Sequence, residues 1–413
     1  MKNRADLLPV DAPAALEVWQ LTEDTVPCSH LYMEAQVFTP DSKRFVLHRS
    51  AHPHGSDQND PEHRYLVCDL ENGGALHPIT EETGATAATV SPDGTTCYYF
   101  VNETSPGGGR LTLKRIGLDG SGRETLCVID GPIPGSPHQP SRPYPLSTIS
   151  SDGKRLAISA FLGDGNTENA PFGLLIFDLE GKEPVRIILE GPSWLNMHPQ
   201  YSRSLDADGR RDILVQENHG GEFSPAGSII HLTGGAGADI HAIRDDGTAF
   251  RNLPWGRDGN EFCQGHQCWR GRSASAITGT SVRDRGVHEL IESEPVAFAG
   301  HVGLATPGGR RNTLSRTVEK PSLRHFATDI EGTRLITDDW ASDGRQLLRT
   351  AEFGPDASDP LENWRFLLDT DNEPAKKGNH SHPFLSPDGN AGFFNSDESG
   401  QLQAYMVTGL FQA

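Results

Sequence analysis

The stretch LSPDGNAGFFN, residues 385–395, combines a tight turn with a short apolar segment. Asp388 and Gly389 predict a sharp chain reversal, because glycine tolerates a positive φ and aspartate can bond nearby backbone. The apolar residues that follow predict a β-strand. The same arrangement recurs along the chain, so this stretch is one copy of a repeat.

Six segments share the pattern: FTPDSKRFVLH (38–48), VSPDGTTCYYF (90–100), ISSDGKRLAIS (149–159), SLDADGRRDILV (204–215), ATDIEGTRLIT (327–337) and LSPDGNAGFFN (385–395). The turn aspartate or its equivalent falls at positions 41, 93, 152, 208, 331 and 388, with gaps of 52, 59, 56, 123 and 57 residues. Half of the long gap predicts a seventh copy near residue 270. There HQCWRGRSASAITG (266–279) is a degenerate version with Arg270-Gly271 at the turn.

A period of this length, with short strands and no helical linkers, is typical of a repeat architecture. The closed form that fits is an all-β, seven-bladed β-propeller. LEVWQLT (16–22) and LQAYMVT (402–408) are expected to close the ring in one shared blade, so residues 1–413 are predicted to form a single domain. Two β-sandwich domains would not produce one period from end to end.

Charge and composition narrow the range of partners. The formal net charge of -20 repels polyanions, so nucleic acid is not expected as a partner. None of the six cysteines forms a CxxC pair, which favours buried reduced cysteines. The N-terminus lacks the apolar region of a signal peptide, and no apolar run has the length of a membrane span. We therefore expect a cytoplasmic protein with no membrane partner, present as a monomer or a homodimer.

Histidines recur just before the predicted turns, in five of the seven copies. The innermost strand of each blade lines the central channel, so these polar residues are expected to converge near the axis. The candidates are His30, His198 with Gln200 and Arg203, His266, Arg324 with His325, and the pair His380 and His382. His380 and His382 are expected to project from the same face of an extended strand.

The residue types point to a metal site. Neutral imidazoles from neighbouring blades, together with oxygen ligands, suit Mn²⁺ or a similar divalent ion. A closed structural zinc site would more often recruit cysteine, and Cys268, two residues after His266, keeps that alternative open.

Five segments resemble, in order and in placement, segments of the oligogalacturonate lyase family: PCSHLYMEAQVFTPDSKRFVL (27–47), HPQYSR (198–203), ENHGGE (217–222), GHQCW (265–269) and HSHPFLSPDG (380–389). Members of that family are cytoplasmic seven-bladed propellers that cleave uronate disaccharides by β-elimination. The resemblance extends over nearly the whole chain and implies the same fold, a divalent ion and a small acidic saccharide substrate.

The resemblance also implies roles for individual residues. His266, His380 and His382 would bind the ion, expected to be Mn²⁺, and His219 stands where the family has its proton-abstracting histidine. Three positions depart from the family: Lys377 replaces a glutamine ligand, Gln267 a glutamate and Asn218 a cysteine. A protonated lysine cannot bind a cation, so the fourth ligand stays open among Gln264, Gln267 and Asn379.

β-Elimination would use these groups together. The proton on C5 of a uronate is weakly acidic, and a divalent ion on the neighbouring carboxylate stabilises the charge left by its removal. His219 would act as base. Arg203 is the second predicted catalytic residue, and Arg203 or Arg324 would hold a carboxylate in a bidentate pair. His30, His198, Gln200, Arg324 and His325 are predicted to contact the substrate.

Three alternatives remain open at this level. The first is a lyase for a different uronate linkage, such as glucuronate–rhamnose. The second is another metal-dependent sugar enzyme. The third is a non-catalytic TolB-like or WD-like propeller that serves as a binding platform, which would need no axial histidines but would carry aromatic and charged anchor residues on one rim.

Overall fold

The computed structural model describes residues 1–23, 25–52, 55–206, 208–255, 261–282, 287–294, 296, 310–356, 359–373 and 380–411. Their regular structure is almost entirely β-strand, with two short 3₁₀-helices, η1 (Ala5–Leu7) and η2 (Pro192–Trp194). The prediction of an all-β fold is confirmed. None of the described helices is long and apolar enough to cross a membrane.

Four antiparallel sheets have four strands each, in chain order from one edge to the other. They are β3 (Cys28–His30), β4 (Arg44–Arg49), β7 (Arg64–Asp69) and β8 (Ala75–Pro78); β9 (Ala85–Val90), β10 (Thr96–Ser105), β11 (Gly108–Gly117) and β12 (Glu124–Ile129); β13 (Arg142–Ile149), β14 (Arg155–Phe161), β15 (Phe172–Asp178) and β16 (Arg186–Gly191); and β27 (Leu323–Thr328), β28 (Arg334–Trp340), β29 (Gln346–Phe353) and β30 (Leu361–Asp369).

The remaining strands form one large sheet, one closing sheet and two short hairpins. The large sheet contains β17 (Gln200–Tyr201), β18 (Asp212–Asn218), β21 (Ala238–Arg244) and β22 (Arg251–Asn252), and β23 (Glu261–Trp269), β24 (Ala276–Val282), β25 (Val287–Ser293) and β26 (Arg311–Thr313). A single residue pair between β21 and β23, Ala238 with Cys263, joins its two halves. The hairpins are β5 (Ala51–His52) with β6 (Gly55–Ser56), and β19 (Glu222–Phe223) with β20 (Ile229–His231).

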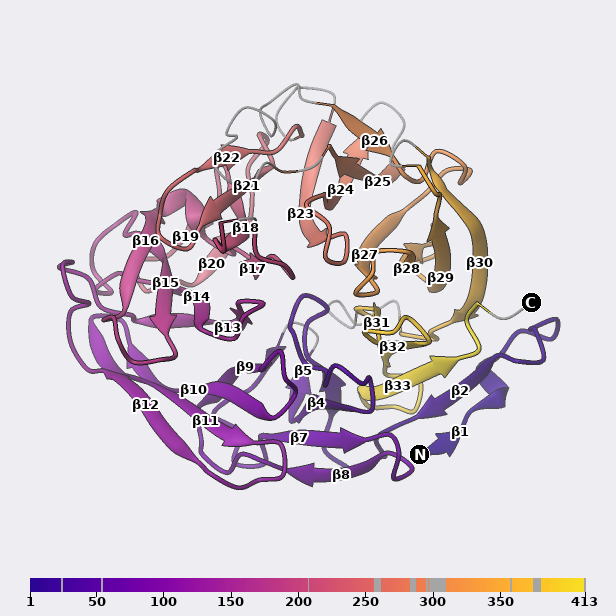
Figure 1. Ribbon diagram of the computed structural model, residues 1–413, viewed down its shortest axis with the longest axis horizontal. Coiled ribbons are helices and arrows are strands. Elements are labelled where there is room, and N and C mark those ends of the chain that lie inside the picture. Colours follow the sequence, from indigo (N-terminus) through magenta and orange to yellow (C-terminus); the bar gives the residue numbers. More distant parts are fainter. Residues whose placement is uncertain are drawn as a thin grey trace.

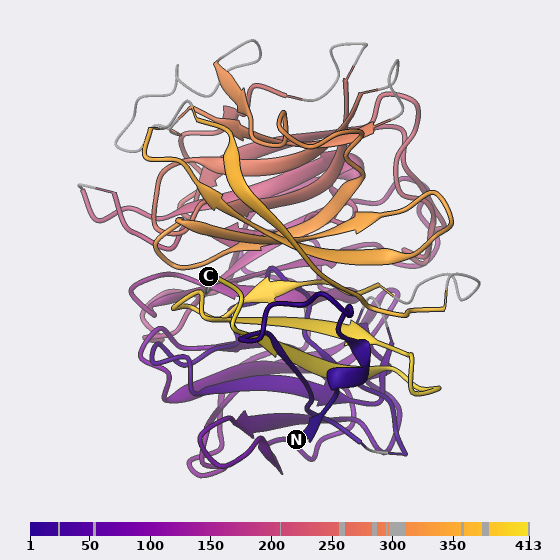
Figure 2. The same cartoon turned by 90° about the vertical axis from the view of Figure 1, so that its right-hand side faces the viewer.

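The closing sheet contains both ends of the chain. Its order is β1 (Lys2–Asn3), β2 (Glu17–Gln20), β33 (Gln403–Thr408), β32 (Ala391–Ser396) and β31 (Phe384–Leu385), and Glu17 pairs with Thr408. The two segments that the sequence analysis expected to share a sheet therefore do pair. Figure 1 shows the sheets arranged around a common centre, with β9, β13, β17, β23, β27 and β31 toward the inside. In Figure 2 the yellow C-terminal strands lie between the orange and the violet sheets, beside the indigo N-terminal chain.

The predicted turns join the first strand of each sheet to the second, as between β9 and β10. Ser91 N donates to Thr96 O at 2.8 Å, the Ser91 hydroxyl donates to Asp93, and Gly94 has a φ of 71°. The same bonds recur from Ser150 to Arg155 O and Asp152, and from Ser386 to Ala391 O and Asp388. The repeated Ser-x-Asp-Gly sequence therefore builds the same turn each time.

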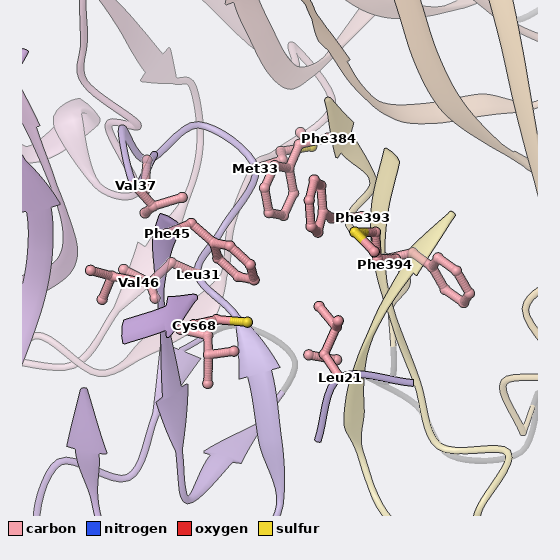
Figure 3. Close-up of a cluster of buried hydrophobic side chains, with 14 of the residues drawn as sticks. Leu21, Leu31, Met33, Val37, Phe45, Val46, Cys68, Phe384, Phe393 and Phe394 are labelled. Atoms are coloured by element: carbon pink, nitrogen blue, oxygen red, sulfur yellow. The ribbon is translucent and has the colours of Figure 1, made fainter. Parts of the chain in front are cut away.

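A hydrophobic cluster packs the first sheet against the closing sheet (Figure 3). The rings of Phe45 and Phe393 have centroids 5.1 Å apart, and Phe384 stacks on Phe393 at 5.3 Å. Burying a phenylalanine side chain stabilises a fold by about 2–3 kcal/mol. The contact between the two ends of the chain thus rests on apolar packing as well as on strand pairing.

Candidate active site

Four histidines meet near the centre, where the first strands of adjacent sheets come together. They are His266 in β23, His325 in β27, and His380 and His382 just before β31. The ring of His325 lies at centroid distances of 4.5 Å from His266, 5.2 Å from His380 and 4.6 Å from His382. One ring nitrogen each from His325, His380 and His382 lie within 4.8 Å of one another. Four of the histidines that the sequence analysis expected near the axis therefore lie together in the structure.

The sequence analysis expected the histidine pair to project from an extended strand, but in the structure the pair does not. β31 begins only at Phe384, and His382 has a φ of 41°, in the left-handed region. Ser381, between the two histidines, anchors this bend: its backbone N donates to Gln346 Oε1 at 2.8 Å and its hydroxyl to Asp338 Oδ2 at 3.1 Å. Hydrogen bonding at Ser381, rather than strand pleat, thus fixes the backbone that carries both rings.

Asp338, in β28, orients His325. Asp338 Oδ2 accepts from Nδ1 of His325 at 2.7 Å and from Nε1 of Trp340 at 2.9 Å, and Oδ1 accepts from the His325 backbone N at 2.7 Å. Burial would raise the pKa of Asp338, but its interaction with His325 and the hydrogen bonds that it accepts from His325 and Trp340 hold that pKa below its usual value. Because Nδ1–H of His325 donates to this carboxylate, Nε2 is left with its lone pair, the arrangement that prepares a histidine to bind a metal.

His266 adjoins this group without belonging to it. Its ring lies beside His325, and it lines a cavity of about 610 Å³. Burial, and then the neighbouring His325, lower the pKa of His266 well below 6.5. Its Nδ1 is buried and has no hydrogen-bond partner among the described residues. His266 is therefore a neutral imidazole at physiological pH that contacts both the histidine group and the cavity.

A second polar chain lies in the wall of the same cavity. His198 Nδ1 lies 2.9 Å from Glu34 Oε2, and His198 Nε2 lies 3.1 Å from the Tyr144 hydroxyl. Burial raises the pKa of Glu34, and the contact with His198 opposes that rise. Tyr32 links the two polar groups, with ring centroids 5.2 Å from His198 and 4.8 Å from His382. The sequence analysis missed Glu34 and Tyr144; a lone glutamate in the apolar stretch LYMEAQV (31–37) was the available signal for Glu34.

The rest of the cavity wall is mainly apolar. Tyr65, Pro143, Phe161 and Phe172 line it, and among the lining residues that the structure describes Arg142 alone has a permanent charge. Nη1 of Arg142 donates to the Ser228 hydroxyl at 2.9 Å. The cavity thus offers one cation, apolar surface and several neutral polar groups.

Three of the predicted substrate contacts have interaction partners within the protein. His30 is 2% exposed, its Nε2 donates to Tyr405 O at 3.0 Å, and its ring packs among phenylalanines of the core. Gln200 Nε2 donates to Gln267 O at 2.6 Å, which ties β17 to β23. The Arg324 guanidinium stacks on Trp340 at 4.3 Å from the ring centroid, and burial lowers the pKa of Arg324. None of the three lines the 610 Å³ cavity.

Arg203 lies elsewhere. It lines a different cavity of about 220 Å³, whose wall includes Pro40, Pro92 and Pro387 from the turns of the repeat. Those turns lie at the far end of the first strands from His198 and His382. Burial lowers the pKa of Arg203. The structure therefore does not bring Arg203 together with the histidines.

His219 follows β18 and pairs with acidic residues. Its Nε2 lies 3.1 Å from Asp239 Oδ2 and 3.7 Å from Glu217 Oε2, and it is not among the residues that line the 610 Å³ cavity. Of the candidate fourth ligands, Gln267 Nε2 donates to His198 O at 3.2 Å, whereas Asn379, like Lys377, lies outside the described residues, as does the side chain of Gln264. The roles predicted for His219 and for a fourth ligand stay predictions.

Solved structures share the fold over nearly the whole chain. A structure described as an oligogalacturonate lyase in complex with manganese superposes with a TM-score of 0.70 and 17% identity, over 97% of this chain and 96% of that one. An oligogalacturonate lyase from Vibrio parahaemolyticus gives 0.69 and 16% over the same shares. An acylaminoacyl peptidase gives 0.51 and 10% over 89% of this chain and 50% of that chain.

At such identities the likeness establishes the fold. The solved lyases that superpose so fully belong to the family that the sequence segments resemble. The sequence itself matches no protein-family model and no curated protein.

Proposed function

We propose that this protein is a metal-dependent lyase that cleaves an oligosaccharide next to a uronic acid by β-elimination. The observation that carries the proposal is the group of three imidazole nitrogens within 4.8 Å, next to His266, which lines a cavity of about 610 Å³. The full-length likeness to two oligogalacturonate lyases, one described with manganese, supports it. In this proposal the four-stranded sheets, the two halves of the large sheet and the closing sheet are the blades of a closed seven-bladed propeller.

We assign the metal site to His325, His380 and His382. The residues fit such an ion, because Asp338 accepts the Nδ1–H of His325 and leaves Nε2 to bind. Three neutral nitrogens leave further coordination positions for oxygen atoms, which suits Mn²⁺ or a related divalent ion. When bound, the ion supplies Lewis-acid stabilisation of the negative charge that develops on the uronate carboxylate. The family resemblance implies that His266 binds the ion, but in this proposal His266 has a different role.

We assign proton abstraction to His266. Its imidazole is neutral, lines the cavity and adjoins His325, so it can reach a sugar held at the metal site. Its Nδ1 is buried, which leaves Nε2 to take the C5 proton. A positioned base contributes about 10²- to 10⁴-fold in rate. His219, the base implied by resemblance, has both acidic partners close to its Nε2 and lies outside the cavity lining.

The other cavity residues would orient the sugar. Glu34 accepts the Nδ1–H of His198, so Nε2 of His198 accepts from the Tyr144 hydroxyl, and the three side chains hold one another in the wall. Arg142 offers the positive charge that a second carboxylate or a sugar hydroxyl would need. The apolar walls exclude water from the reacting centre.

A second candidate keeps the reaction and changes the linkage. Among the described lining residues only Arg142 has a permanent charge, and Phe161 and Phe172 stand in the wall, which favours a neutral, partly apolar neighbour over a second uronate. A glucuronate–rhamnose linkage has that character, because rhamnose carries a methyl group in place of a carboxylate.

The test is the ultraviolet absorbance of the conjugated double bond that elimination creates and hydrolysis does not. Mn²⁺-loaded protein would be given digalacturonate and, separately, a glucuronate–rhamnose disaccharide. We expect absorbance to rise on at least one, and to stay flat after chelation and in His325→Ala and His266→Ala. His231→Ala, at an exposed histidine of β20, is the matched control and should keep wild-type activity. Activity that survives His325→Ala would refute the assignment of the site.

A further inference from the structure

A second group of titratable side chains lies on one face of the large sheet, away from the proposed active site. Glu217 is directly opposite Asp239 in the β18–β21 pairing, and Val215 is opposite His241. His219 lies two residues after Glu217, and His241 lies two residues after Asp239. Side chains two residues apart on a strand share a face of the sheet, so the four side chains form one cluster. Two carboxylates directly opposite each other repel and destabilise a sheet unless positive charge lies between them.

Three nitrogen–oxygen distances within this cluster are compatible with a metal site. Nε2 of His219 lies 3.1 Å from Asp239 Oδ2 and 3.7 Å from Glu217 Oε2, and Nε2 of His241 lies 3.3 Å from Glu217 Oε2. A tetrahedral zinc with bonds of about 2.0–2.1 Å places its ligand atoms about 3.3 Å apart. Glu217, Asp239 and His241 each also offer a ligand atom within 4.8 Å of the other two.

The hydrogen bonds around the cluster direct lone pairs into it. His241 Nδ1 lies 2.8 Å from Asn252 Oδ1, an acceptor, so Nδ1 carries the proton and Nε2 the lone pair. That Nε2 is buried and has no hydrogen-bond partner within the described part of the chain, although the Glu217 carboxylate faces it at 3.3 Å, and the His241 side chain is only 4% exposed. The Ser193 hydroxyl donates to Glu217 Oε1 at 2.7 Å, which leaves Oε2 toward the two histidines. A cation between these acceptors resolves their repulsion.

We propose that Glu217, His219, Asp239 and His241 bind a structural Zn²⁺ ion. Two imidazoles and two carboxylates complete a tetrahedral set with no open position, in contrast to the three imidazoles of the His325 group. The ion would clamp β18 to β21, and through Ser193 it would hold η2 against the sheet. The partly exposed edges of the carboxylates, at 21% and 15%, give an ion access to the site.

The test counts Zn²⁺ ions bound per chain after equilibrium dialysis, by metal analysis. The wild-type chain should bind two ions, a variant with both Glu217→Gln and Asp239→Asn one, and His380→Ala one. Glu222→Gln, an exposed carboxylate in the neighbouring strand β19, is the matched control and should bind two. Equal binding by the wild-type chain and the double variant would overturn the proposal. Loss of Zn²⁺ in His380→Ala reports on the other site alone, so the two assignments fail separately.

A second measurement covers the case in which the double variant does not fold. In His380→Ala, with the cluster intact, added Zn²⁺ should raise the thermal unfolding midpoint, since an ion that binds only the folded chain stabilises it. An unchanged midpoint across a Zn²⁺ titration would overturn the proposal.

Discussion

Replacement of Asp338 by asparagine tests the orientation of His325 without changing the side chain's shape. Oδ2 of Asp338 accepts from His325 Nδ1, Trp340 Nε1 and the Ser381 hydroxyl, while Oδ1 accepts from the His325 backbone N. The amide of asparagine can place its oxygen at only one of these positions. The oxygen should take the Oδ2 position with its three donors, so the NH₂ group would face the His325 backbone N–H.

The expected loss has two parts. Outer-shell partners of metal-binding histidines are worth about 10- to 100-fold in metal affinity, or about 1.4–2.8 kcal/mol. The unsatisfied backbone donor at His325 should lower the free energy of unfolding by about 1–3 kcal/mol. Isothermal titration of Mn²⁺ into metal-free protein measures the first, and urea unfolding of the same preparation measures the second.

Asp339→Asn is the matched control, because the neighbouring Asp339 bonds Arg349 at 2.8 Å and the backbone of Ser322 rather than a histidine. It should leave Mn²⁺ affinity unchanged. Mn²⁺ affinity that is equal in Asp338→Asn and the wild-type chain would refute the reasoning that Asp338 prepares His325 for a metal.

Three further perturbations test the core and the cavity. Burial lowers the pKa of His30 from 6.5 to about 4, so the unfolded chain binds the proton first, and the free energy of unfolding should fall by about 3 kcal/mol as the pH drops from 6.5 to 4. His30→Gln should flatten this part of the pH profile measured by urea unfolding. A variant profile parallel to that of the wild type would contradict the assignment of this pH dependence to His30. Phe393→Ala should lower the free energy of unfolding by about 3–5 kcal/mol, measured in urea, because Phe393 is fully buried in the cluster that joins the ends of the chain; a loss below about 1 kcal/mol would show that this contact is not needed. Arg142→Gln should raise KM for the uronate substrate more than it lowers kcat, with Arg110→Gln, an exposed partner of Glu103, as the neutral control; equal KM values would remove Arg142 from substrate binding.

The repeat and its turns were predictable because their causes are local. Ser150, Asp152 and Gly153 build their turn from hydrogen bonds and a positive φ within a few residues, so the sequence pattern maps directly to the structure. The pairing of the chain ends was predictable for a related reason, since the first and last segments share the apolar pattern of strands that need a partner.

The sequence analysis placed Arg203 near the histidines, although its separation of five residues from His198 already indicated a different location. His198 precedes β17 and Arg203 follows it, so the strand carries the two side chains to opposite ends. Five residues of strand span about 16 Å. Residues converge near the axis only when they lie at the same height along their inner strands. A residue further along its strand, such as Arg203, lies near the other end of the channel.

The residues that hydrogen-bond to the metal-site histidines could not be predicted from the sequence for a different reason. Asp338 lies in the second strand of its sheet, outside the segments before the turns, and it meets His325 only through strand pairing. Likewise, whether His325 or His266 lies beside His380 depends on ring orientations that packing sets. Neither the strand pairing nor these orientations can be read from the sequence alone.

The pairing of β2 with β33 has a consequence for synthesis of the chain. β2 leaves the ribosome long before its partner, β33. Until Gln403–Thr408 emerges, Val18 and Leu21 have no partners in the closing sheet, and Phe45 lacks the rings of Phe384 and Phe393. The nascent chain therefore displays the apolar surface around β2 until β33 emerges, which is the condition under which chaperones bind. Emergence of β33, rather than the completion of any other sheet, sets the moment at which the closing sheet can form.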